Sequence, residues 1–266
     1  MVRFATLTIG TFLALLWSYG VAQESTQRSI ALNSIIEALE KTQAGIRPRV
    51  SYQVVREYQL FGAKELNPKS DVVAEVDFQP PASKDYRIQK SSGGNRGEQV
   101  VRRILEHEVE AASQGSQSRT ALNRDNYTFV YNGEVTLDGQ PCYVLGLQPK
   151  RKEAELVSGE AWIDKHSFFV RQIEGELAKT PSWWLKKVHV KLTFADVSGA
   201  WLQTHMEAVA DVRVAGSHTL TSRILDYRAP AEVAASVSAH QKWEAGKHHS
   251  IEEIRSFAVS ATAPSF

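Results

Sequence analysis

The chain lacks the residues and motifs on which several large classes of protein depend. Cys142 is its only cysteine, so no disulfide can form within the chain. A free thiol packed in the core is expected, and the alternative is a reactive or intermolecular thiol. The eight histidines are scattered without the ligand spacing of a zinc site. The sequence contains no glycine-rich phosphate loop and no Gly-x-Ser-x-Gly elbow. We therefore predict no catalytic residue, no metal and no cofactor.

An excess of charge of either sign is also missing. The chain has 31 Lys and Arg against 30 Asp and Glu, which gives a formal net charge of +1. Proteins whose main partner is a polyanion usually carry a clear basic excess, so nucleic acid is not an expected partner. After residue 22 no apolar run is long enough to cross a membrane, which takes roughly 20 residues.

The first 22 residues have the layout of a secretory signal peptide. Arg3 provides a positive start, and the stretch from Phe4 to Trp17 is apolar except for Thr and Gly. Gly20 and Ala22 supply small residues at positions −3 and −1 of a cut before Gln23. The alternative is an uncleaved membrane anchor. Because no cysteine follows the cut, the lipid attachment of a bacterial lipoprotein is not expected, and we predict a soluble protein secreted across the inner membrane into the periplasm.

Two later segments have the period of amphipathic helices. In Ser29–Ala44 the apolar residues Leu32, Ile35, Ile36 and Leu39 share one face. The second helix is expected over Gly97–Ala112, with an apolar stripe formed by Val100, Val101, Ile104, Leu105, Val109 and Ala112. Each stripe is narrow, so each helix should lie on something larger.

The rest of the chain up to Tyr227 alternates with period two, which is typical of strands with one face in an apolar space. Val50–Phe61, Asp71–Phe78 and Asp85–Gln89 lie before the second helix. Asn132-Gly133 and Asp138-Gly139 are predicted turns in the region after it. The strands expected there are Tyr127–Tyr131, Cys142–Leu147, Gly159–Asp164, Phe168–Leu177, Trp184–Phe194, Trp201–Val214 and His218–Tyr227.

These patterns predict a mainly β protein with two or three helices. A sheet this long must curl, and its concave apolar face must be covered, for which the two helices are available. The expected architecture is one long, curled antiparallel sheet whose mouth is closed by the two helices. Residues 1–22 form the signal peptide, residues 23–230 the barrel domain and residues 231–266 a C-terminal tail.

One segment resembles a known superfamily. Gly159-Glu-Ala-Trp-Ile-Asp-Lys-His-Ser-Phe-Phe-Val-Arg-Gln-Ile173 is similar to the strand-turn-strand signature of the periplasmic lipoprotein-carrier superfamily. That superfamily includes LolA-like and LolB-like carriers, RseB/MucB-type sensing domains and outer membrane lipoprotein-sorting protein homologues. The Tyr52-to-Val54 strand, the run Cys142–Lys150 and the close at Ile224–Arg228 match in the same order, so the resemblance covers about Ser29 to Arg228.

The resemblance implies an unclosed, strongly curved antiparallel β-barrel with a helical lid. It also implies that the cavity takes acyl chains and that there are no catalytic residues. Arg56 is the nearest candidate for the barrel-facing arginine of some carriers, and the alternative is an arginine at a strand edge with its head in water. We expect the cavity to be lined by apolar residues of the inward faces together with Arg56: Tyr52, Val54, Arg56, Tyr58, Val76, Phe78, Tyr86, Val188, Val190, Leu192 and Phe194.

Two functions fit this architecture. The first is a non-enzymatic periplasmic binding or carrier protein for the acyl chains of lipid or lipoprotein, with roles in lipoprotein localisation and outer membrane biogenesis. The second is a regulatory module that senses such chains and acts on a membrane protein partner. Extractable lipid in the purified protein is expected for both, whereas a stoichiometric protein partner is expected for the second.

The first prediction is that the exported protein begins at Gln23, because the peptidase pocket accepts the small Gly20 and Ala22 at positions −3 and −1. Mass analysis of the secreted protein checks this. An intact Met1, or an acylated new terminus, would contradict it.

Overall fold

The computed structural model describes residues 31–45, 50–63, 65–81, 83–113 and 117–228. The predicted signal peptide and the C-terminal tail therefore lie outside the described residues. A leading helix covers residues 31–45. It is followed by two helices and ten strands, which are β1 (Tyr52–Phe61), β2 (Ser70–Gln79), β3 (Ser83–Gly93), α2 (Asn95–Ser113), α3 (Gln117–Thr120), β4 (Tyr127–Leu137), β5 (Gln140–Pro149), β6 (Val157–Asp164), β7 (Val170–Leu177), β8 (Leu185–Val197), β9 (Ala200–Val212) and β10 (Gly216–Arg228).

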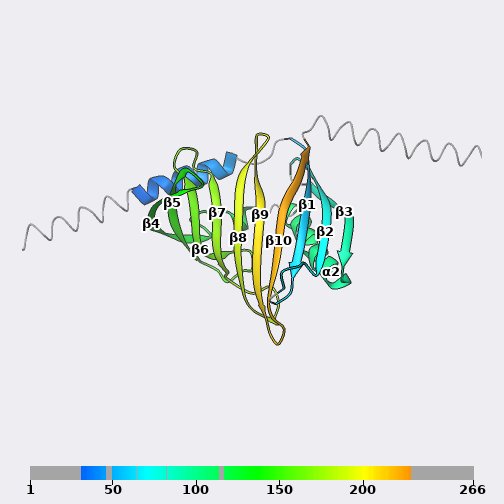
Figure 1. Cartoon of the computed structure of the whole chain (residues 1–266). Helices are drawn as coiled ribbons and strands as arrows, with labels where there is room; N and C mark the ends of the chain where they lie inside the picture. The colour runs from blue at the N-terminus through cyan, green and yellow to red at the C-terminus, as the bar shows by residue number, and fades with distance from the viewer. Residues whose placement is uncertain (1–30, 46–49, 64, 82, 114–116, 229–266) are drawn as a thin grey trace, which may run out of the picture.

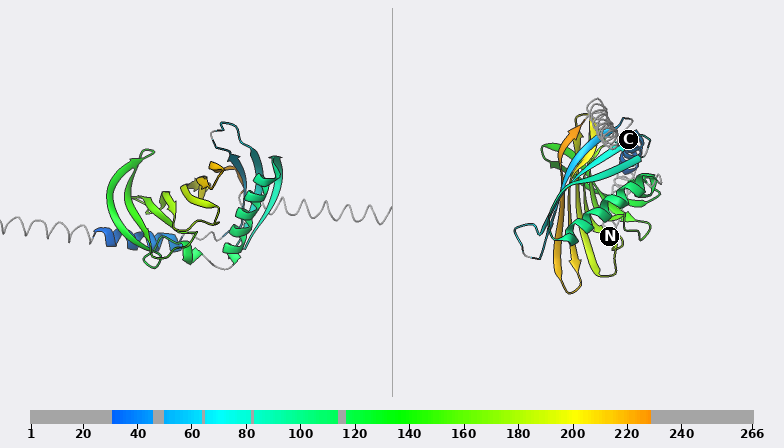
Figure 2. Two further views of the ribbon diagram at one scale, coloured as in Figure 1. Left: turned by 90° about the horizontal axis from the view of Figure 1, so that it is seen from below. Right: turned by 90° about the vertical axis from the view of Figure 1, so that its right-hand side faces the viewer.

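All ten strands belong to one curled, unclosed antiparallel sheet (Figure 1). The strand order is β3-β2-β1-β10-β9-β8-β7-β6-β5-β4. Neighbouring strands are consecutive in the chain except at one place, where the first strand pairs with the last. The two edges are β3 and β4, and Figure 2 shows them bent toward each other with the helices on the concave side. The predicted fold class is confirmed.

A pair of glycines allows the backbones of β6 and β7 to approach closely. Gly159 and Gly175 lie directly opposite each other in the register. A Cβ atom on Gly159 would lie 2.1 Å from the carbonyl oxygen of Glu174, and one on Gly175 would lie 2.3 Å from the carbonyl oxygen of Ser158. Because no real Cβ atom tolerates such distances, the backbones approach this closely only where side chains are missing.

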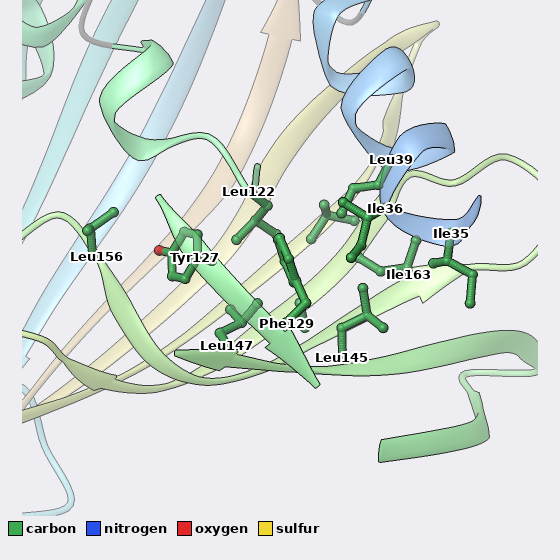
Figure 3. Close-up of a cluster of buried hydrophobic side chains, with 12 residues drawn as sticks. Ile35, Ile36, Leu39, Leu122, Tyr127, Phe129, Leu145, Leu147, Leu156 and Ile163 are labelled. Atoms are coloured by element: carbon green, nitrogen blue, oxygen red, sulfur yellow. The ribbon is translucent and has the colours of Figure 1, made fainter. Parts of the chain in front are cut away.

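The leading helix covers the concave face at the β4 edge of the sheet. Ile35, Ile36 and Leu39 are buried in a cluster with side chains of β4, β5 and β6 (Figure 3). Polar contacts fix the helix to the segment before β4. The Glu40 carboxylate accepts hydrogen bonds from the backbone N–H and the guanidinium of Arg124, at 2.8 and 2.6 Å.

Helix α2 covers the same face at the opposite edge, where it packs on β2 and β3. Val101 and Leu105, each 1% exposed, are buried against residues of β1 and β2. The helix begins close to the sheet because Gly97 has no side chain, and a Cβ atom there would lie 2.1 Å from Ser70 Oγ. Both predicted helices therefore lie on the concave face, as expected.

Three local expectations are wrong. Asn132-Gly133 is not a turn, because β4 continues through it with a bulge beside Gly133, whose φ is 114°. Val50 does not join the inward face of its strand, since it precedes β1 and is 54% exposed. Trp184 is 39% exposed and also precedes its strand, whose register shifts between Leu185 and Lys187.

Cys142 is a free thiol and is completely buried, so the expected packing is confirmed. Burial raises the pKa of this thiol. A buried, protonated thiol is a poor nucleophile, which is consistent with a structural residue.

We predict that Leu39→Ala lowers the free energy of unfolding by about 2–5 kcal/mol, because it leaves a void in a cluster where Leu39 is fully buried. Lys41→Ala on the exposed side of the same helix is the control and should change stability by less than about 0.5 kcal/mol. Chemical denaturation measures both. Equal effects would show that the helix is not held by this cluster.

Candidate ligand-binding surface on the concave face

The pairing register traces the concave side of the sheet from strand to strand. Directly opposed residues point to the same side of a sheet. One such row crosses six strands from β1 to β6 and consists of Tyr58, Ser222, Met206, Leu192, Ile173 and Ala161. Tyr58 belongs to the cluster under α2, and Ala161 belongs to the cluster under the leading helix. The whole row therefore faces the concave side.

Apolar side chains in the middle of this face remain half-exposed. Tyr58 and Ala161, at the two ends of the row, are 1% and 0% exposed, and Ser222 beside Tyr58 is 2% exposed. Met206, Leu192 and Ile173 in the middle of the row keep contact with solvent. Leu192 belongs to none of the buried clusters of the described residues and packs against none of them. We call this surface the central strip, and it consists of Ile173, Leu192, Phe194, Met206, Ala208 and Ile224.

The predicted cavity residues lie in four settings on this face. Five are buried under α2, and these are Tyr52, Val54, Tyr58, Val76 and Phe78, with Tyr86 partly buried against them. Val188 and Val190 are buried in a smaller cluster with Val157 and Leu185. Leu192 and Phe194 lie in the central strip. Arg56 is half-buried beside the row.

The Arg56 side chain bridges across β10 to β9. Its Nη2 donates a hydrogen bond to the carbonyl oxygen of Gln203 at 2.7 Å. The register of β8 against β9 shifts next to this residue, between Thr193 and Phe194, so that Thr204 is an extra residue in β9. A bulge of this kind interrupts the regular ladder and redirects backbone groups, which gives the guanidinium an acceptor on the inner side.

Burial under α2 changes the titration of two tyrosines. It raises the pKa of both Tyr52 and Tyr58 to about 12. For Tyr58 the nearby carboxylate of Glu108 adds to the increase, whereas Arg56 acts in the opposite direction. Both tyrosines are buried, whereas the side chains of the central strip are half-exposed.

Five residues of the candidate site were not predicted from the sequence. Ile173, Met206, Ala208 and Ile224 lie in the central strip, and Ser222 is buried directly opposite Tyr58. Period-two alternation predicted their strands. Nothing in the alternation indicates that β10 pairs with β1, and only this pairing brings Ser222 to Tyr58.

The described residues hold neither a metal cluster nor a membrane-spanning helix. No group of three or more His, Cys, Asp or Glu is placed to hold a metal ion in the described ranges. No helix in this part of the chain is long and apolar enough to cross a membrane.

Comparison with protein families identifies one family. A family model whose description reads "Uncharacterized protein" matches residues 99–232. The match spans just over half of the chain, so the chain belongs to this family. No curated protein gives a significant match.

Several solved structures are similar to this chain. A putative outer membrane lipoprotein-sorting protein domain from Vibrio parahaemolyticus is 14% identical, with a TM-score of 0.39, and the match covers 73% of this chain and 91% of that one. A DUF1329 family protein from Desulfovibrio piger is 11% identical, with a TM-score of 0.38, and the match covers 74% and 92%. A LolA superfamily protein from Nitrosomonas europaea is 13% identical, with a TM-score of 0.33, and the match covers 74% of this chain and 92% of that one.

These matches include members of the superfamily that residues 159–173 resemble.

We predict that the native protein keeps Tyr58 un-ionised well above pH 10. Its folded pKa of about 12 exceeds the ordinary value of 10.0, so its contribution to stability is present below pH 10 and is lost as the pH rises through about 12. Tyr58→Phe should remove tyrosinate absorbance from the high-pH transition, measured immediately after a pH jump. If the substitution instead removed tyrosinate absorbance from the part of the titration near pH 10, Tyr58 would not be buried as described.

Proposed function

We propose that this protein is a non-enzymatic binding or carrier protein for the acyl chains of lipid or lipoprotein, and that it works in the periplasm. The observation that carries the proposal is the central strip. Six apolar side chains lie side by side on a concave surface, between clusters that two helices cover, and all six stay half-exposed. The sequence resemblance to lipoprotein carriers and the N-terminal export pattern point in the same direction.

The energetics favour an apolar occupant of this strip. Burial of apolar surface contributes roughly 25 cal/mol per Å², or about 0.8 kcal/mol for each methylene group. A flexible chain of methylene groups fits a curved row of aliphatic side chains because it needs no hydrogen-bond partner there. The side chains of the strip differ in size, and Met206 in particular adapts to ligands of different shape.

We predict that Leu192→Glu prevents binding of a fluorescent fatty acid, because a carboxylate placed in the strip would lose its hydration to the acyl chain. Since Leu192 is half-exposed and lies outside the buried clusters, the variant should still fold. Displacement by unlabelled fatty acid measures the specific part of the signal, which should fall at least tenfold.

Thr193→Glu is the matched control, since it introduces the same charge at the next position of β8 on the other face of the sheet. The control should bind as the wild type does. Equal loss in both variants, or no saturable binding by the wild type, would count against the proposed function. Native mass spectrometry of protein purified from its own periplasm then identifies the natural ligand.

A further inference from the structure

Three polar side chains gather where the central strip meets the α2-covered cluster. Tyr58 on β1 lies directly opposite Ser222 on β10, and Arg56 lies two residues before Tyr58 on the same face. The row continues from Ser222 to Met206, which belongs to the central strip. Arg56 lies opposite Ile224, another residue of the strip. We call these three residues the polar end of the strip.

Both hydroxyl groups of the polar end are buried without a hydrogen bond. Tyr58 is 1% exposed and Ser222 is 2% exposed, and neither hydroxyl oxygen has a partner in the described structure. Arg56 and Ser222 lie close enough to Tyr58 to lower its pKa, yet neither forms a hydrogen bond of acceptable geometry with its oxygen. A guanidinium only donates and each hydroxyl donates one hydrogen, so these three groups have more donors than acceptors among themselves, and an added acceptor would pair them.

The charge at the polar end is also uncompensated. Arg56 uses Nη2 for the bond to Gln203, which leaves other guanidinium N–H groups available. Within the described residues no carboxylate oxygen lies within 4.0 Å of its guanidinium nitrogens. The nearest acidic influence on Tyr58 is Glu108 of α2, and that carboxylate is itself 3.4 Å from Lys84 Nζ. Arg56 therefore has no ion-pair partner among the described residues.

We propose that Arg56, Tyr58 and Ser222 bind the carboxylate of a fatty acid whose chain lies along the central strip. This inference rests on the proposed function, because it assumes that the strip holds an acyl chain. A carboxylate accepts several hydrogen bonds, so it pairs both hydroxyl groups and the guanidinium at once. From Ser222 the row runs over Met206 and Leu192 to Ile173, three strand spacings or about 14 Å away, which accommodates much of an acyl chain.

The test compares hexadecanoic acid with its methyl ester as competitors of a fluorescent acyl probe on the full chain. The two ligands share the chain and differ in the charge of the head. The wild type should bind the acid at least tenfold more tightly than the ester. This comparison needs no variant, so it does not depend on whether a substituted protein folds.

Two substitutions locate the preference. Arg56→Met and Tyr58→Phe should each reduce the affinity for the acid by at least fivefold and leave the affinity for the ester within twofold of the wild type. Arg223→Met is the matched control. Arg223 neighbours Ser222 in β10 but points to the outer face, where it pairs with Glu57 at 2.6 Å, so its removal should keep the preference for the acid.

The outcomes separate the two proposals. If the wild type binds acid and ester equally, the carboxylate site is wrong and acyl binding stands. If the control Arg223→Met abolishes the preference as Arg56→Met does, the preference reflects overall charge and the site is again wrong. If neither ligand binds saturably, the proposed function itself fails.

Discussion

The antiparallel pairing of β1 with β10 is the constraint on which the rest of the structure depends. Glu57 and Arg223, which are opposite each other in this ladder, are 166 residues apart in the chain. Every other ladder joins consecutive strands. Without the β1–β10 pair the chain would form a three-stranded and a seven-stranded sheet with separate edges. The pair joins them into one surface and places the polar end of the strip at the seam.

The uncovered middle of the concave face follows from where the covering helices are attached. Helix α2 follows edge strand β3 directly and folds back onto it. The leading helix is fixed by Glu40 to Arg124, just before the other edge strand β4. Both covers therefore lie near the edges, and α2 packs mainly on β3 and β2. The half-exposure of Leu192 and Met206 therefore follows from where the topology places the two helices.

Alternation predicted the strands because a sheet with one buried face imposes period two on the sequence, as in Tyr52 to Leu60. It also placed the predicted cavity residues on one face. It failed where local backbone geometry overrides the pattern, as at Gly133, where a bulge keeps β4 going through an apparent turn. It gave no information about the β1–β10 pairing, because both strands have generic apolar faces. Ser222, an unremarkable serine in the sequence, could not be linked to Tyr58 without that pairing.

The proposed carboxylate site would account for the hydroxyl and guanidinium groups on an otherwise apolar surface. An apolar side chain at position 222 would remove one of the two buried hydroxyl groups that lack a partner, without the loss of a hydrogen bond. The serine therefore contributes little to folding by itself. The hydroxyl pair becomes favourable only when an acceptor enters, and Arg56 supplies the charge that makes an anionic acceptor preferable to a neutral one. The part of the surface that stabilises the empty protein least is thus the part with most to gain from a ligand.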